Sequence, residues 1–175
     1  MLSWLTNAWR VPELRRRLLF TAMVIALYRL GSWVPAPGVD SEQIRNYFST
    51  QGGTVLGLLN LFSGGALSQF SLFALGIMPY VTASIILQLM TVVIPRLGEL
   101  QKEGEAGYAK ITQYTRYLTI VLAAAQATGY AFLFRSQGAL DAGSGELVLI
   151  IVTLTAGTTL LMWMGELITK RGIGN

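Results

Sequence analysis

Apolar residues occur along this chain in long runs that are separated by short polar connections. Three of these runs, Leu18–Val34, Tyr117–Phe134 and Leu147–Ile168, are each long enough to cross a bilayer as one helix. A fourth run, between Arg45 and Arg96, extends over about fifty residues without a charged side chain, where about twenty suffice for one crossing. The pattern therefore predicts an all-α integral membrane protein.

Composition supports this class and narrows the chemistry. The chain is 53% apolar and 13% charged, with a mean hydropathy of +0.52, values typical of proteins that reside in lipid. It contains neither histidine nor cysteine, which removes the usual zinc ligands, thiol nucleophiles and disulfides. The sequence also lacks a phosphate-binding loop and a dinucleotide fingerprint. We therefore predict no catalytic, cofactor-binding or metal-binding residue, and no enzyme.

The distribution of basic residues predicts the orientation in the membrane, because short cytoplasmic connections are enriched in Lys and Arg. Basic residues gather in three segments: Arg10, Arg15, Arg16 and Arg17; Arg96, Lys102, Lys110 and Arg116; and Lys170 and Arg171. The two remaining connections each hold one, Arg45 or Arg135, among acidic residues. We expect the first three segments to be cytoplasmic and the other two to be external.

This orientation limits the number of crossings in the long uncharged run. With Arg45 outside and Arg96 inside the number is odd, and three crossings need about sixty apolar residues, which exceeds the run. One crossing leaves an apolar segment from Thr54 to about Phe70, which ends in Ser63-Gly64-Gly65. Such a segment either re-enters the membrane, with its irregular backbone buried in protein or facing water, or lies flat on the outer leaflet.

Pro79 falls about two turns into the remaining apolar stretch, Phe73–Ile94. A proline at that depth predicts a kinked helix. Ile77 and Val81 are spaced four apart and share one helix face, a pattern that is also typical of ordinary packing. Other side chains project from different faces: Thr82, Ile86 and, less closely, Gln88.

Several literal strings resemble the SecY family of protein-conducting channels. The most specific are LNLFSGGALS at Leu59–Ser68 and FALGIMPY at Phe73–Tyr80. Further strings follow the same family in the same order: Pro12–Arg15, Tyr28–Gly31, Pro35–Gly38, Thr91–Pro95, Lys102–Glu105, Gln113–Tyr117 and Arg171–Asn175. Together they cover nearly the whole chain, which is far more specific than any single string.

The resemblance implies a ten-helix channel in two halves of five helices, of which this chain carries four transmembrane helices plus a short re-entrant plug helix. We therefore expect a fragment that holds half of a pore. The expected boundaries are a cytoplasmic amphipathic segment at 1–17, membrane helices at 18–34, 70–94, 117–134 and 147–168, external loops at 35–54 and 135–146, the plug at 55–69, and cytoplasmic segments at 95–116 and 169–175.

Matching the family residue by residue assigns the functional positions. The pore ring takes Ile77 and Val81 from this half, and the lateral gate takes Thr82, Ile86 and Gln88 together with Gln126, which in its alanine-rich context is also suited to helix packing. The plug comprises Val55, Leu58, Leu59, Leu61, Phe62, Ser63, Gly64, Gly65, Ala66 and Leu67. Gln69 departs from the family, because many bacterial relatives carry arginine there.

The function implied is the central subunit of a channel that passes unfolded secretory proteins across the bacterial inner membrane and releases membrane helices laterally. The implied partners are SecE, SecG, a SecA motor or a translating ribosome, signal peptides, nascent chains and lipids, without sequence-specific nucleic acid binding. Two alternatives remain: a secondary transporter, which needs ion-coordinating residues within the spans, and a membrane-protein biogenesis scaffold. We also expect Arg29 to reach lipid headgroups and Glu166 to pair with Lys170 on the helix surface.

Overall fold

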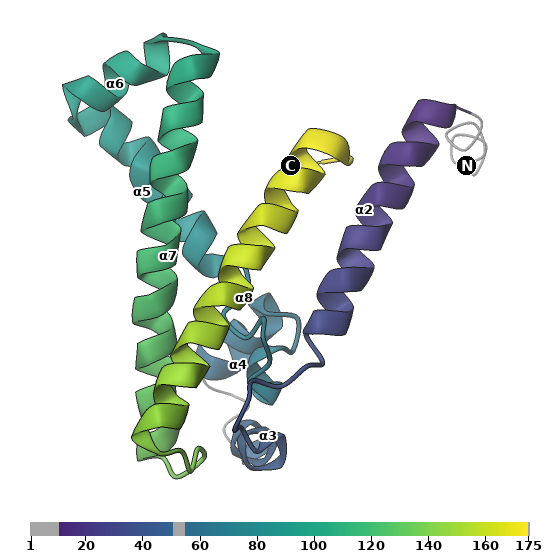
Figure 1. Cartoon of the computed structure of the whole chain (residues 1–175), viewed down its shortest axis with the longest axis vertical. Helices are drawn as coiled ribbons and strands as arrows, with labels where there is room; N and C mark the ends of the chain where they lie inside the picture. The colour runs from purple at the N-terminus through teal and green to yellow at the C-terminus, as the bar shows by residue number, and fades with distance from the viewer. Residues whose placement is uncertain (1–10, 51–54, 175) are drawn as a thin grey trace.

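The computed structural model describes residues 11–50 and 55–174, and these residues form helices joined by turns (Figure 1). The elements are α2 (Pro12–Gly31), α3 (Ser41–Thr50), α4 (Val55–Phe62), the short 3-10 helix η1 (Leu67–Gln69), α5 (Met78–Val93), α6 (Pro95–Lys102), α7 (Glu105–Ser136) and α8 (Ser144–Arg171). An all-α fold is thus confirmed for these ranges. The expected amphipathic N-terminal segment lies, as far as Arg10, outside the described residues.

Two of these helices, α7 with 32 residues and α8 with 28, are long and apolar enough to cross a membrane. A third span results if α5 and α6 are counted as one, although the pair is bent by 101°. Helix α2 is not among them, and its 20 residues include Arg15, Arg16, Arg17 and Arg29. Length and composition therefore support two or three spans, and the count of four remains a prediction.

The connections fall at two ends of the helical array. Figure 1 shows the start of α2, the short helix α6 and the end of α8 at one end, and α3 with the α7–α8 connection at the other. The segments that the basic residues assign to one side of the membrane are therefore at the same end of the molecule.

The predicted kink at Pro79 is wrong. Helix α5 begins at Met78, so Pro79 lies in its first turn, where the missing N–H costs no helical hydrogen bond. The preceding residues form turns, with Gly76 at φ 60° and Phe70 at φ 45°. The helical part of the expected span at 70–94 is therefore shorter than the apolar run.

Helix α3 lies where the sequence indicates only an external loop. Asp40 begins it by accepting a hydrogen bond from the Glu42 amide at 2.9 Å, and Ile44 and Phe48, four residues apart, are both buried. That apolar spacing within a polar segment is the signal that predicts this helix.

The chain after α2 leaves and returns to the same place. The Ala36 amide donates to the Phe70 carbonyl at 3.0 Å, the Leu72 amide donates to the Val34 carbonyl at 2.9 Å, and Pro35 forms an antiparallel bridge with Ser71. Residues 37–69 are therefore an excursion whose two ends are tied together directly before α5.

Two groups of buried side chains hold the array together, and the segment after α4 contributes to both. Phe134 of α7 is the centre of the larger group, with ring centroids 5.1 Å from Phe70 and 5.8 Å from Tyr47. The smaller group joins α2 to α8 through Val24, Ala66, Phe73, Leu161 and Met164. The turns at 66–75 therefore connect α2, α7 and α8.

Candidate pore and plug site

Helix α4, the first half of the predicted plug, is apolar and exposed on one side, while Leu56 and Leu59 on the other side pack in part against the larger buried group. None of its eight residues is buried, and Leu61 and Phe62 are 76% and 67% exposed. An apolar patch of this kind on a folded chain indicates a surface that meets another partner or lipid. The plug residues Val55, Leu58 and Leu59 belong to the same helix.

The turn that follows α4 contains three buried residues, Ser63, Ala66 and Leu67, and is rich in hydrogen bonds. The Ser63 hydroxyl accepts from the Leu67 amide at 3.1 Å, and the Asn60 side-chain oxygen accepts from the Ser68 amide at 2.9 Å. Gly64 and Gly65 adopt φ values of 60° and 86°, a left-handed conformation that favours glycine. Ala66 and Leu67 are fully buried against the two cores.

Two side chains at the end of α2 contact this turn. The Tyr28 hydroxyl donates to the Ser63 carbonyl at 2.7 Å, and Arg29 Nη1 donates to the Gly64 carbonyl at 3.0 Å. The hydrogen bond of Arg29 to the plug turn was not expected from the sequence, and contact of its guanidinium with lipid headgroups stays a prediction.

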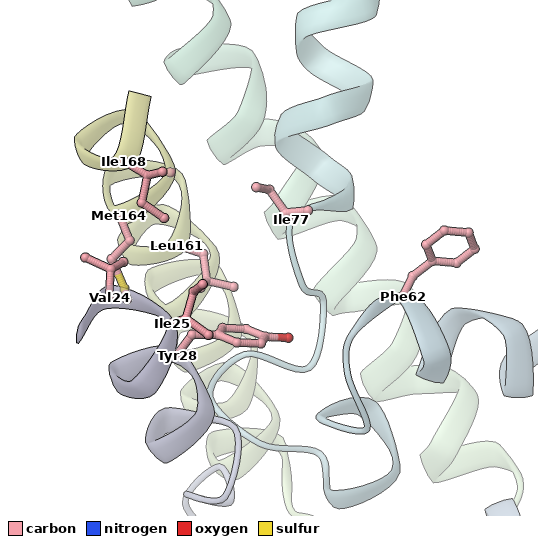
Figure 2. A pocket seen from close by; sticks show the side chains of 9 residues that line it. Val24, Ile25, Tyr28, Phe62, Ile77, Leu161, Met164 and Ile168 are labelled. Atoms are coloured by element: carbon pink, nitrogen blue, oxygen red, sulfur yellow. The ribbon is translucent and has the colours of Figure 1, made fainter. Parts of the chain in front are cut away.

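A cavity of about 280 Å³ lies between α2, α8 and the start of α5. In Figure 2 the Ile77 side chain faces residues of α2 and α8, among them Ile25 and Leu161. The lining of the cavity is almost entirely apolar: Val24, Ile25, Tyr28, Phe62, Ile77, Leu161, Met164, Gly165 and Ile168. Such a lining provides contact area without groups that bind a particular side chain.

The structure separates the two predicted pore-ring residues. The two side chains are about equally exposed, at 43% for Ile77 and 40% for Val81. Ile77 directly precedes α5 and lines the cavity, whereas Val81, one turn further along, is not part of that lining. The Val81 amide donates to the Ile77 carbonyl at 3.1 Å, so the two residues still follow each other along one face.

The predicted lateral-gate residues lie beside the packed face of α5. Ala83 and Leu87 form the buried stripe, Thr82 is half-buried, and Ile86 and Gln88 are exposed. Gln126 is half-buried on α7. No contact between Gln126 and the three α5 positions is among the hydrogen bonds of the described ranges, so their joint role stays a prediction.

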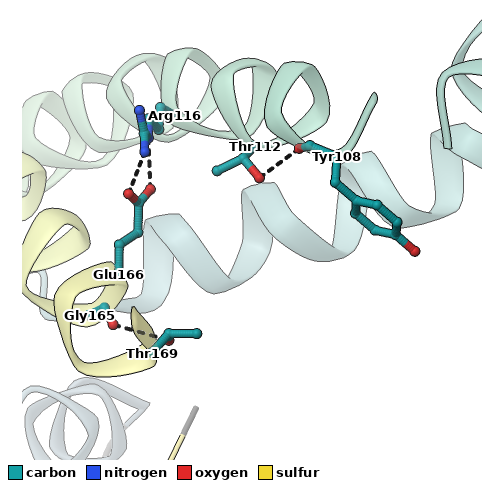
Figure 3. A network of polar contacts seen from close by, with 6 residues as sticks. All are labelled: Tyr108, Thr112, Arg116, Gly165, Glu166 and Thr169. Carbon is teal, nitrogen blue, oxygen red and sulfur yellow. Dashed lines mark hydrogen bonds and ion pairs between the residues drawn. The ribbon is translucent and has the colours of Figure 1, made fainter. Parts of the chain in front are cut away.

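An ion pair between α7 and α8 was not predicted. Arg116 donates to both carboxylate oxygens of Glu166, with Nε to Oε1 at 2.7 Å (Figure 3). The Glu166 side chain is only 10% exposed. The expected pairing of Glu166 with Lys170 is therefore wrong, and the bidentate contact ties α7 to α8 instead.

No cluster of three residues able to hold a metal ion occurs within residues 11–50 and 55–174. These ranges instead define an all-helical protein of membrane type, in which a partly exposed apolar helix and its anchored turn lie next to an apolar cavity.

Comparison with known proteins identifies the family. The SecY family model matches residues 71–175. Three relatives are described as protein translocase subunit SecY. The proteins from Streptomyces coelicolor and Mycobacterium tuberculosis are 53% and 49% identical to this chain over its whole length. The protein from Corynebacterium glutamicum is 48% identical over 99% of the chain. The chain belongs to the SecY family. It spans 42–43% of the length of these relatives.

Proposed function

We propose that this chain supplies the first four membrane helices of the pore-forming subunit of a protein translocation channel. The channel passes unfolded secretory proteins across the bacterial inner membrane and releases hydrophobic helices sideways into lipid. The observation that carries this proposal is the pairing of a partly exposed apolar helix, α4, with an apolar cavity at Ile77. Both surfaces have the character of a passage that contacts many sequences and binds none tightly.

Residues 55–69 act as the stopper in this proposal. Helix α4 presents bulky apolar side chains to the passage, and Ile77 and Val81 form this half of the ring around the moving chain. Thr82, Ile86 and Gln88 of α5 line one side of the lateral exit with Gln126 of α7. The opposite side of pore and gate comes from helices that this chain does not contain.

The proposed topology has four spans and a cytoplasmic N-terminus. It is supported by Figure 1, where α6 and both described chain ends share one end of the array, and by the tied ends of the excursion at Val34–Ala36 and Phe70–Leu72. An excursion that returns to its starting point adds no crossing. In this topology α2 and α5 are the first two spans.

The chain performs no covalent chemistry in this proposal. Transport energy comes from a SecA motor or a translating ribosome, and SecE, SecG and lipids surround the channel, while signal peptides and nascent chains are its substrates. A secondary transporter is less well supported, since Asn60, the one candidate ion ligand of the central run, uses its side-chain oxygen to cap the plug turn. A biogenesis scaffold has no need of the cavity.

The proposal is tested by crosslinking in the complete channel. Leu59 and Ile77 are replaced by cysteine one at a time. A secretory chain that carries a thiol-reactive crosslinker is then stalled in the channel. Val152 is the control. It lies on the side of α8 opposite to Leu161, which lines the cavity. We expect products at Leu59 and Ile77 and none at Val152; products at neither Leu59 nor Ile77 contradict the pore assignment.

A further inference from the structure

We propose that Tyr28 and Arg29 form a latch that holds the plug in its closed position. This inference rests on the proposed function of residues 55–69 as a stopper. The two residues are consecutive at the end of α2, and they donate to two consecutive carbonyls, those of Ser63 and Gly64. They are positioning residues, because they act on the plug and not on the translocating chain.

The acceptors of the latch lie at the C-terminal end of α4. The last carbonyls of a helix lack amide partners within it and carry partial negative charge. The turn satisfies some of these groups itself, through Ser63 to Leu59 and Gly65 to Asn60. The Gly64 carbonyl receives the Arg29 guanidinium, so the cation lies where the helix dipole favours it.

Close packing fixes the two donors relative to the turn. The Tyr28 ring stacks on Phe73 with centroids 5.5 Å apart. Gly31, one turn after Tyr28, leaves so little space that an added Cβ would come within 2.1 Å of the Phe73 ring. Phe73 and Ala66 belong to one buried cluster. The end of α2 and the plug turn therefore move together, or the two hydrogen bonds break.

The latch adds to the contacts that keep a partly exposed helix in place. No residue of α4 is fully buried, although Leu56 and Leu59 pack in part against the larger buried group, so the closed position depends largely on the turn and on the hydrogen bonds from α2. Weakening the latch raises the fraction of channels whose plug has left its seat in the absence of substrate. It also lowers the stringency with which signal sequences are selected.

The test measures plug release directly. Ala66 is fully buried and the chain has no cysteine, so Ala66→Cys reports release through its labelling rate with a membrane-impermeant maleimide, in the complete channel with other cysteines replaced. Tyr28→Phe removes one hydroxyl and retains the ring stack. We expect this variant and Arg29→Gln each to label about three- to tenfold faster, the range expected when one hydrogen bond is lost.

Two matched controls make the same chemical changes elsewhere. Tyr47→Phe and Arg45→Gln alter residues on α3 for which no side-chain hydrogen bond or ion pair to residues 55–69 occurs within the described ranges, and we expect neither to change labelling. Equal rates for latch and control variants overturn the latch. Export of a reporter with a defective signal sequence is measured in parallel. Faster labelling without increased export supports the latch and contradicts the stopper role of the plug.

Discussion

The two halves of the segment 55–69 differ in almost every physical respect. Helix α4 is apolar and has no fully buried residue, and its Leu61 and Phe62 side chains are mostly exposed. In the turn that follows, Ser63, Ala66 and Leu67 are buried, and the turn is hydrogen-bonded to itself and tied to α2 through Ser63 and Gly64. The difference teaches that the turn holds the segment in place at rest, while the exposed side of α4 is available for contact with other partners.

The largest effect is expected at the anchor's core. Phe134 is fully buried and its ring lies 5.1 Å from that of Phe70, so Phe134→Ala leaves a cavity beneath the plug turn. We expect a loss of about 3–5 kcal/mol in the free energy of unfolding, measured by denaturant titration of the purified channel. A loss no greater than that of Phe62→Ala removes the distinction between the two halves.

The ion pair between α7 and α8 is expected to rank second. Arg116→Gln leaves the Glu166 carboxylate, only 10% exposed, without its cation. We expect about 2 kcal/mol of destabilisation, reduced from the cost of a fully buried pair because Arg116 is itself partly exposed. Adding Glu166→Gln removes the stranded charge and recovers part of the loss; additive losses in the double variant contradict direct coupling.

A smaller effect is expected at the left-handed turn. An alanine at Gly64 has to adopt φ 60° and brings its Cβ within 3.2 Å of the Tyr28 hydroxyl, whereas a Cβ at Gly65 meets nothing within 4 Å. Gly64→Ala therefore costs about 1–2 kcal/mol, and Gly65→Ala costs less because it pays only the backbone strain. Thermal unfolding of the two variants side by side measures the difference; equal midpoints exclude contact with Tyr28.

The smallest effect on stability is expected on α4. Phe62→Ala removes a side chain that is mostly uncovered, so the free energy of unfolding changes by less than about 1 kcal/mol. Ion leak through the resting channel, by contrast, increases because the stopper loses apolar bulk, and electrical recording in planar bilayers measures it. Unchanged leak argues against α4 as part of the seal.

The sequence predicts the continuous elements well and the contacts poorly. Helices α7 and α8 are predicted by unbroken apolar runs. The apolar segment before α5 that is not needed for a crossing is predicted from the placement of Arg45 and Arg96 on opposite sides of the membrane. The sequence does not show that Pro79 lies at a helix start, because apolar residues continue on both sides of it. The apolar pattern alone therefore does not mark where α5 begins.

The contacts that define the site join residues far apart in sequence. Tyr28 and Arg29 act on carbonyls 35 residues away, and any residue type supplies a carbonyl, so no side-chain pattern marks the acceptor. Arg116 and Glu166 are 50 residues apart, and the nearer Lys170 offers a plausible local partner. Tertiary packing decides both cases, and spacing along one helix does not.

The central claim is that the plug turn is seated at rest and leaves its seat when a chain passes. The most direct measurement compares maleimide labelling of Ala66→Cys and Leu58→Cys in channels with and without a stalled secretory chain. The account predicts that Leu58, already exposed, labels in both states, and that Ala66 labels only in the occupied channel. Labelling of Ala66 that is equal in empty and occupied channels contradicts the account.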